Sequence, residues 1–312
     1  MTISLGYQIP NFTYPGGVET LFDTVVAQAR EAEQAGFDTV AVMDHFYQLP
    51  GIGSPDNPML EAYTTLGALA ASTSTIQLST LVTGITYRNP TLLAKAITTL
   101  DVISHGRAVL AMGTGWFELE HTALGYEFGT FGDRFRRLDE ALEIILPMVR
   151  GERPSFEGHW YRAQDAMAEP RYRDRIPVML GGSGEQKTFR IAARHADHMN
   201  IIAPRSELAH KVRVLAERCE EINRDPATLE TSYLTTVIPV ENEAERTRLA
   251  ETLPPRLRDG GLFGTPDEIA ERIADEVIGV GVTGLFINMT INGHEPGRIT
   301  AMADALRPVI HG

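Results

Sequence analysis

The chain has 312 residues, 43% of them hydrophobic and 22% charged, which is the balance of a globular protein. Its 41 acidic and 28 basic residues give a net charge of −13, which argues against a nucleic-acid partner because phosphate binding needs clustered Lys and Arg. Cys219 is the one cysteine, so we expect a packed thiol, no metal site and a cytoplasmic protein. No apolar run reaches membrane-spanning length, and no membrane partner is expected.

Short β-branched runs alternate with amphipathic helical runs along the chain. We expect strands at 3–9, 39–44, 76–83, 107–112, 177–182, 198–202, 231–240 and 284–289. We expect helices at 18–35, 60–74, 91–104, 133–150, 185–196, 206–223, 266–280 and 296–308. Strands that are apolar throughout are typical of parallel sheets buried on both faces. Eight such βα units predict an α/β fold, a single (β/α)8 TIM-barrel domain over 1–312, with insertions after strand four and before strand five.

An open, doubly wound sheet is the alternative architecture. Its nucleotide loop would follow the first strand, where the chain has "IPNFTYPGG" and no G-x-G-x-x-G. The pattern therefore favours the barrel.

Three segments interrupt the repeat. Residues 116–132 are expected to form a long loop, 151–176 to contain a hairpin around "FEGHWYR", and 241–265 to form a mobile lid or loop with a Pro-Pro and a Gly-Gly pair. Long insertions in barrels tend to cover or wall the active site.

In a barrel of this kind the active site lies at the C-terminal ends of the strands. Polar or small residues follow the expected strands, including Gln8, Asn11, Asp44, His45, Asn200 and Asn288. No pair of carboxylates converges there as glycoside hydrolysis requires, and no Lys ends a strand as Schiff-base chemistry requires. His45 could give or take a proton, although Asp44 could equally cap a turn while His45 packs.

Two glycine-containing segments invite a cofactor interpretation. "GGSG" at 181–184 ends the fifth strand directly before the expected helix, which favours an anion site over a plain tight turn. "GTGW" at 113–116 looks like the start of a dinucleotide loop, but Glu118 stands where the third glycine would be, and we expect no helix to begin on it. We interpret its glycines as making room for a ring system at the barrel mouth.

The segment "STLVTGITYRNP" at 79–90 runs past the expected strand end and bends at Gly84. A bulge that brings backbone close to a flat ligand would explain it. A plain strand, loop and helix with Pro90 at the helix start would explain it too.

Taken in order, "MDHF", "LVTGITYRNP", "SHGRAVLAMGTGWFELEHTALG", "RFRRLDEAL", "PVMLGGSGE" and "FGTPDEIAERI" resemble the bacterial luciferase-like flavin and deazaflavin oxidoreductases. The series looks closest to the F420-dependent oxidoreductases of actinobacteria. The resemblance implies a TIM barrel that transfers a hydride between the deazaflavin F420 and a small organic substrate. An FMN-dependent monooxygenase that activates O₂ and a non-catalytic cofactor-binding protein are the alternatives. Dimers are common among such relatives, so a homodimer is a further expectation.

The resemblance also implies residue roles. His45 would be catalytic, with Asp44 beside the reactive ring. Three further groups would hold the cofactor: the bulge residues Thr80, Leu81 and Thr83, the floor residues Gly113, Thr114 and Gly115, and the phosphate cradle Gly181, Gly182, Ser183 and Gly184. Relatives carry a non-proline cis peptide in the bulge, which by register falls at Thr80-Leu81 to within one residue.

One position departs from the family's pattern. Sugar-phosphate dehydrogenases of the family have an acidic glutamate after the G-T-G, and this chain has Trp116, which argues against a glucose-6-phosphate dehydrogenase. Trp116 and Phe117 are expected to wall a substrate pocket, with a core position for Trp116 as the alternative. Glu118 and Glu120 are expected to be solvated or to cap the following segment, without a catalytic role.

Overall fold

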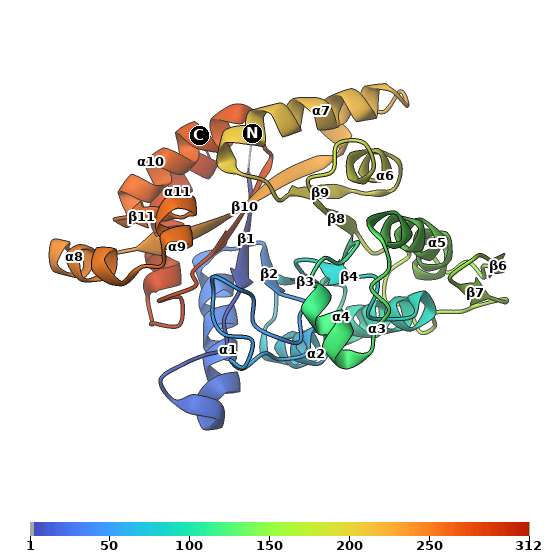
Figure 1. The fold of residues 1–312 in the computed structure, drawn as a ribbon, viewed down its shortest axis with the longest axis horizontal. Coiled ribbons are helices and arrows are strands. Elements are labelled where there is room, and N and C mark those ends of the chain that lie inside the picture. Colours follow the sequence, from blue (N-terminus) through green and yellow to red (C-terminus); the bar gives the residue numbers. More distant parts are fainter. Residues whose placement is uncertain (1–2, 312) are drawn as a thin grey trace.

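Eight parallel strands close into a barrel in the computed structural model, which describes residues 3–311 apart from the side chains at 256 and 259. The strands are β1 (Ser4–Ile9), β2 (Thr39–Val42), β3 (Gln77–Thr80), β5 (Ala108–Gly113), β8 (Val178–Gly182), β9 (His198–Ile201), β10 (Glu230–Pro239) and β12 (Gly284–Asn288). Each pairs in parallel with the next, and β12 pairs with β1 to close the ring (Figure 1). The predicted barrel and all eight predicted strands are confirmed.

Helices surround this barrel, one after nearly every strand (Figure 1). They are α1 (Gly17–Ala35), α2 (Ala62–Ser72), α3 (Pro90–Ile103), α5 (Phe131–Val149), α6 (Thr188–His195), α7 (Leu208–Glu220), α10 (Pro266–Glu276) and α11 (Arg298–Ile310). Short 3₁₀ turns lie at Arg205–Glu207, Pro226–Thr228 and Ile278–Val280. Local sequence fixes several starts, because Thr130 and Thr265 each form a capping box with the acidic residue three positions on.

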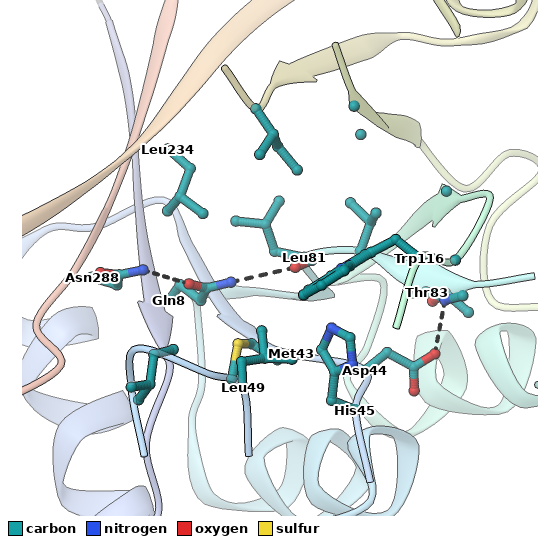
Figure 2. A pocket seen from close by; sticks show the side chains of 18 of the residues that line it. Gln8, Met43, Asp44, His45, Leu49, Leu81, Thr83, Trp116, Leu234 and Asn288 are labelled. Atoms are coloured by element: carbon teal, nitrogen blue, oxygen red, sulfur yellow. Dashed lines mark hydrogen bonds between the residues drawn. The ribbon is translucent and has the colours of Figure 1, made fainter. Parts of the chain in front are cut away.

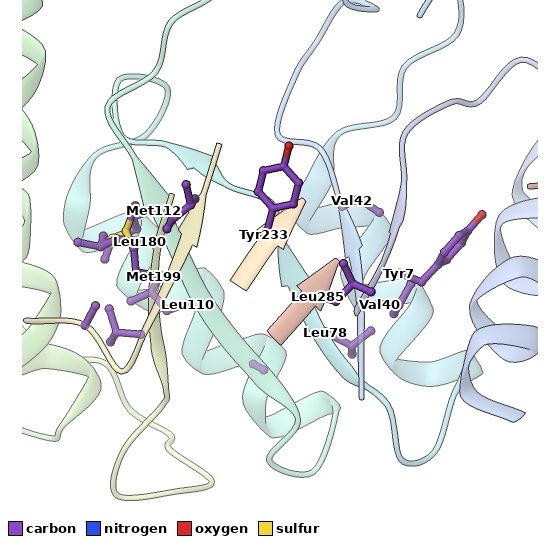
Figure 3. Packing of buried hydrophobic residues seen from close by; sticks show 14 of the residues in the cluster. Tyr7, Val40, Val42, Leu78, Leu110, Met112, Leu180, Met199, Tyr233 and Leu285 are labelled. Atoms are coloured by element: carbon purple, nitrogen blue, oxygen red, sulfur yellow. The ribbon is translucent and has the colours of Figure 1, made fainter. Parts of the chain in front are cut away.

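Strand side chains alternate between two apolar layers. Those pointing outward, such as Val40, Leu78 and Leu110, pack under the helices (Figure 3). Those pointing inward form a smaller cluster of Ala41, Leu81, Val109, Ala111, Met179 and Phe286. A Cβ at Gly6 would lie 2.2 Å from the Phe286 ring, so that glycine makes room for the largest side chain of this cluster.

The ends of the described chain meet on the side of the barrel where the strands begin. The amide of Ile3, directly before β1, donates to the carbonyl of Ile310 at the end of α11, with 3.1 Å between the two atoms.

The insertions are more ordered than expected. The predicted hairpin is confirmed as β6 (Phe156–Glu157) paired with β7 (Arg162–Ala163). The predicted loop at 116–132 was wrong in part, since α4 (Glu118–Leu124) begins two residues after Trp116. No helix begins on "GTGW" itself, as expected, because the N-cap of α4 is Phe117. The segment predicted to be an irregular lid folds as α8 (Glu243–Thr252), α9 (Pro255–Gly260) and β11 (Leu262–Gly264).

A charged pair holds α8 to the barrel. Of the residues of α8, all of them described, only Glu245 is buried, and it accepts hydrogen bonds from Arg298 of α11 at 2.7 and 3.2 Å. Burial by itself raises the pKa of Glu245, but the hydrogen bonds from the Glu241 amide and Arg298 outweigh it and leave that pKa below its ordinary value. The stabilisation is therefore present above the ordinary glutamate pKa of about 4.3 and is lost as the pH falls through the lower folded value.

Glu245→Gln should loosen α8 without unfolding the barrel. We expect the local free energy of opening to fall by roughly 2 kcal/mol, because Arg298 loses a buried partner but keeps Glu295. Amide hydrogen exchange across α8 at neutral pH measures the change. Glu243→Gln, on the same helix with a side chain 82% exposed, is the matched control, and equal exchange in both variants would contradict the anchor.

Candidate functional site

A cavity of about 590 Å³ lies at the C-terminal ends of the barrel strands. Eleven of the fourteen residues given a site role from the sequence line it: Asp44, His45, Leu81, Thr83, Gly113, Thr114, Gly115, Trp116, Gly181, Gly182 and Ser183. Thr80, Phe117 and Gly184 were named with them but lie outside this lining. Figure 2 shows the Gln8–Asn288 amide pair on one side of the cavity and His45 with Trp116 on the other.

The His45 imidazole is held by a buried carboxylate. Its Nδ1 lies 2.9 Å from Oε2 of Glu120, a residue with no exposed surface. A carboxylate that accepts the Nδ1 proton leaves Nε2 as the ring nitrogen available to the cavity. The expectation that Glu120 is solvated was wrong, because α4 turns this side chain inward.

Glu120 also accepts hydrogen bonds from the backbone that follows His45 and from a tyrosine in a second segment. The Tyr87 hydroxyl donates to it at 2.6 Å and the Tyr47 amide at 2.8 Å, and the Phe46 amide donates as well. Burial alone would raise the pKa of Glu120, but the bonds from His45, Tyr87 and Tyr47 outweigh it and leave that pKa lowered. The carboxylate is therefore ionised at neutral pH.

Two aromatic rings flank the imidazole. The ring centroids of Trp116 and Phe117 lie 5.7 and 5.9 Å from that of His45, both edge-on. Trp116 is 58% exposed and lines the cavity, whereas Phe117 is buried behind it. Of the two readings of Trp116, the wall position fits and the core position does not.

Asp44 is an ion-pair partner rather than a free acid. Its carboxylate accepts hydrogen bonds from the two terminal nitrogens of Arg88, at 2.7 and 2.9 Å, and from the Gly84 amide at 3.0 Å. Burial raises the pKa of Asp44 and the Arg88 guanidinium opposes that effect. Arg88 is shared with Glu61 and lies 4.8 Å from the Tyr63 ring centroid. Arg88 was not among the predicted site residues, because nothing in its sequence context "YRNP" marks it as buried.

The bulge after β3 is real. The cis peptide lies at Leu81-Val82, one residue after the central expectation and inside the stated range. Two residues on, β4 (Thr83–Gly84) pairs with β5. The Thr80 hydroxyl lies 2.8 Å from that of Thr83, so Thr80 supports the bulge from behind instead of lining the cavity.

The same bulge explains Gly113 of β5 and Gly181 of β8. A Cβ at Gly113 would lie 2.9 Å from a Val82 methyl, and one at Gly181 would lie 2.8 and 2.9 Å from both. Val82 therefore fills the room that we assigned to a ring system at Gly113, and it also fills the space beside Gly181 of the expected phosphate cradle. Gly115, by contrast, has φ +73°, a backbone conformation that favours glycine.

The "GGSG" segment differs from expectation in its helix. The following α6 begins at Thr188, not at 185, and the Phe189 amide donates to the Gly184 carbonyl. Ser183 and the two glycines before it line the cavity, while Gly184 forms the turn into α6. The cavity is therefore lined here by a strand end and not by a helix terminus, and the anion site at this segment stays a prediction.

The sequence of this chain is similar to those of known proteins. Residues 3–256 match the family described as luciferase-like monooxygenase. The chain belongs to this family. Relatives include an F420-dependent glucose-6-phosphate dehydrogenase of Microbacterium testaceum (36% identical, 63% of this chain and 56% of the relative) and an F420-dependent hydroxymycolic acid dehydrogenase of Mycobacterium tuberculosis (33%, 66% and 56%). This chain thus spans about half the length of the curated relatives it matches.

Solved structures of similar fold agree with the barrel. An F420-dependent secondary alcohol dehydrogenase in complex with an F420-acetone adduct superposes with a TM-score of 0.82 at 21% identity, covering 99% of both chains. An EDTA monooxygenase from Chelativorans sp. BNC1 gives 0.83 at 15% identity, covering 100% of this chain and 94% of the other. At these identities the likeness shows the fold.

Two polar atoms in this luciferase-like cavity lack partners. Asn288 Oδ1 and Thr290 Oγ1 are buried and find no hydrogen-bond partner among the described residues. Both residues line the cavity, and an unsatisfied buried polar atom costs about 1–3 kcal/mol. The Asn288 amide donates to Gln8, and the Gln8 amide donates to the Leu81 carbonyl. This row of amides at the bulge fits the polar edge of a flat heterocycle such as a flavin or deazaflavin.

Other classes of site find less support in the part of the chain from 3 to 311. No group of three or more His, Cys, Asp or Glu side chains among these residues could hold a metal ion. Within the same range, every helix is too short or too polar to cross a membrane.

Gly181→Ala should destabilise the barrel through Val82. We expect a loss of about 1–3 kcal/mol in the free energy of unfolding, measured by urea titration. The double variant Gly181→Ala/Val82→Ala should lose at least about 1 kcal/mol less than the sum of the two single changes, because the clash disappears.

Gly67→Ala is the control for this pair. Gly67 lies in α2 with nothing within 4 Å of an added Cβ, so its change should be neutral or stabilising. If the losses of unfolding free energy in Gly181→Ala and Val82→Ala simply add in the double variant, Val82 is not the reason that residue 181 is a glycine.

Proposed function

We propose that this chain is an F420-dependent oxidoreductase that moves a hydride between the deazaflavin and a small organic substrate. The observation that carries the proposal is the His45–Glu120 pair, which faces the same cavity as the bulge and the partnerless Asn288 and Thr290 oxygens. The F420-dependent relatives at 33–36% identity support the choice of cofactor.

Three parts of the cavity would hold the cofactor. The ring would lie against the bulge at Leu81 to Gly84, with its polar edge at Gln8 and Asn288. The strand ends at Gly113 to Gly115 and at Gly181 to Ser183 would hold the side chain and phosphate. When bound, F420 supplies a ring carbon that takes or gives a hydride.

The chain's own contribution is orientation and a proton. His45 Nε2 would take the proton of a substrate hydroxyl, or return it to a carbonyl oxygen. Glu120 positions the imidazole and keeps the Nδ1 proton in place. Asp44 is a positioning residue as well, since its charge is committed to Arg88 and its oxygen fixes the Gly84 amide of the bulge.

The cofactor is tested by reconstitution. We expect the purified apoprotein to bind F420 with a Kd in the micromolar range or below and FMN at least tenfold more weakly, measured by absorption spectra and mass of the retained compound. Tighter binding of FMN would replace the proposal with a flavin monooxygenase. Binding of neither compound would remove cofactor chemistry from this site.

Glu120→Gln tests the positioning role. The amide keeps the shape but loses the charge facing Nδ1, so kcat should fall roughly 10–100-fold while KM and the F420 Kd change less than about threefold. Glu118→Gln, an exposed neighbour on the same helix, should leave kcat unchanged.

The fall in kcat should persist across neutral pH. Because the pKa of Glu120 is lowered, its carboxylate stays ionised above about pH 4.3. The wild-type protein should therefore have a higher kcat than Glu120→Gln throughout pH 6 to 9, and the difference should shrink only as the pH falls through the lowered value. Equal kcat values anywhere between pH 6 and 9 would contradict the positioning role.

A further inference from the structure

We propose that the outer part of the cavity binds an uncharged substrate with a hydrocarbon skeleton, such as a secondary alcohol or ketone, and not a phosphorylated one. This inference rests on the proposed function and adds the substrate class to it. The cavity residues outside the bulge, the amide pair and the glycine strand ends carry it.

Apolar side chains from five separate segments converge there. They are Leu49 and Ile52 from the loop after β2, Trp116 after β5, Ile202 after β9, Leu234 of β10 and Leu257 of α9. Segments that are far apart in sequence therefore form one apolar surface in the outer part of the cavity. Trp116 and Ile202 are 58% and 46% exposed, and large apolar side chains grouped at a cavity mouth indicate an apolar ligand.

The charges around the cavity are already matched. Among the described lining residues the ionisable side chains are Asp44, His45 and Tyr87. Asp44 is paired with Arg88, and the Tyr87 hydroxyl donates to Glu120. His45 is therefore the one described ionisable group left to meet a ligand, and it suits a single hydroxyl or carbonyl oxygen.

A phosphate dianion would be poorly placed in this surface. The backbone donors at the glycine strand ends would already hold the cofactor's phosphate, and no lysine or arginine occurs among the described lining residues to neutralise a second one. An uncompensated charge taken out of water is strongly unfavourable. The partner that fits is one polar oxygen at His45 attached to an alkyl group that covers the six side chains. Affinity should then increase with the length of that alkyl group.

The test uses a homologous series on the cofactor-loaded protein. Ligand-observed saturation-transfer NMR gives the Kd of propan-2-ol, pentan-2-ol, heptan-2-ol and glucose 6-phosphate. We expect the Kd to fall about threefold for each added methylene, and glucose 6-phosphate to bind at least tenfold more weakly than heptan-2-ol.

A pair of variants locates the effect. Ile202→Lys places an ammonium at the mouth and should raise the Kd of heptan-2-ol at least fivefold. Leu92→Lys makes the same kind of change on α3, at a side chain 58% exposed and outside the lining, and should leave that Kd unchanged.

Three outcomes would overturn the inference: a Kd independent of chain length, tighter binding of glucose 6-phosphate than of heptan-2-ol, or equal effects of the two lysine variants. Each is measured on protein that has retained F420, so it leaves the proposed cofactor standing. If the protein does not retain F420, the proposed function is wrong. The Kd values of the alcohol series on the apoprotein then still show whether the outer part of the cavity binds longer alkyl groups more tightly.

Discussion

The carboxylate of Glu120 is the contact on which the geometry of the site depends. It lies in a short helix after β5 and accepts hydrogen bonds from His45, from the backbone that follows it and from Tyr87 beyond the bulge. Three loops that leave three different strands therefore meet at one buried charge. A buried carboxylate is stable only while its hydrogen-bond donors stay in place. The three loops therefore cannot move independently, and the orientation of the imidazole is fixed.

A second buried charge does the same for the bulge. Asp44 binds Arg88 and the Gly84 amide, and Arg88 reaches on to Glu61 at the start of α2. Adjacent residues of one strand end thus serve different loops: Asp44 fixes the surface on which a ring would lie, and His45 faces the cavity. The imidazole of His45 and the bulge are therefore linked through two adjacent backbone positions.

Hydrophobic periodicity predicted every barrel strand and the eight helices that surround the barrel. The rule that a barrel's active site lies at the carboxyl ends of its strands predicted the edge at which the cavity lies. Both were insufficient wherever polar residues are buried. The residues that α4 buries are Glu120 and His121, so it shows no apolar stripe, and α8 buries only Glu245 among its described residues. A single sequence also does not show which distant residues pair. For this reason Arg88, the partner of Asp44, was not predicted, and neither was the contact by which Val82 requires glycine at 113 and 181. Gly125, a C-cap with φ +76°, was a local sign that a helix ends there.

The hydrogen bond from Ile3 to Ile310 has a practical consequence for handling the molecule. Both residues lie where the barrel strands begin, while the cavity opens where they end (Figure 1). A purification tag, a fluorescent partner or a surface tether joined near either residue would leave from the face opposite the mouth. The protein can therefore be immobilised from that side with its cavity turned toward solution, and the two attachment points are close enough to be bridged by a short peptide.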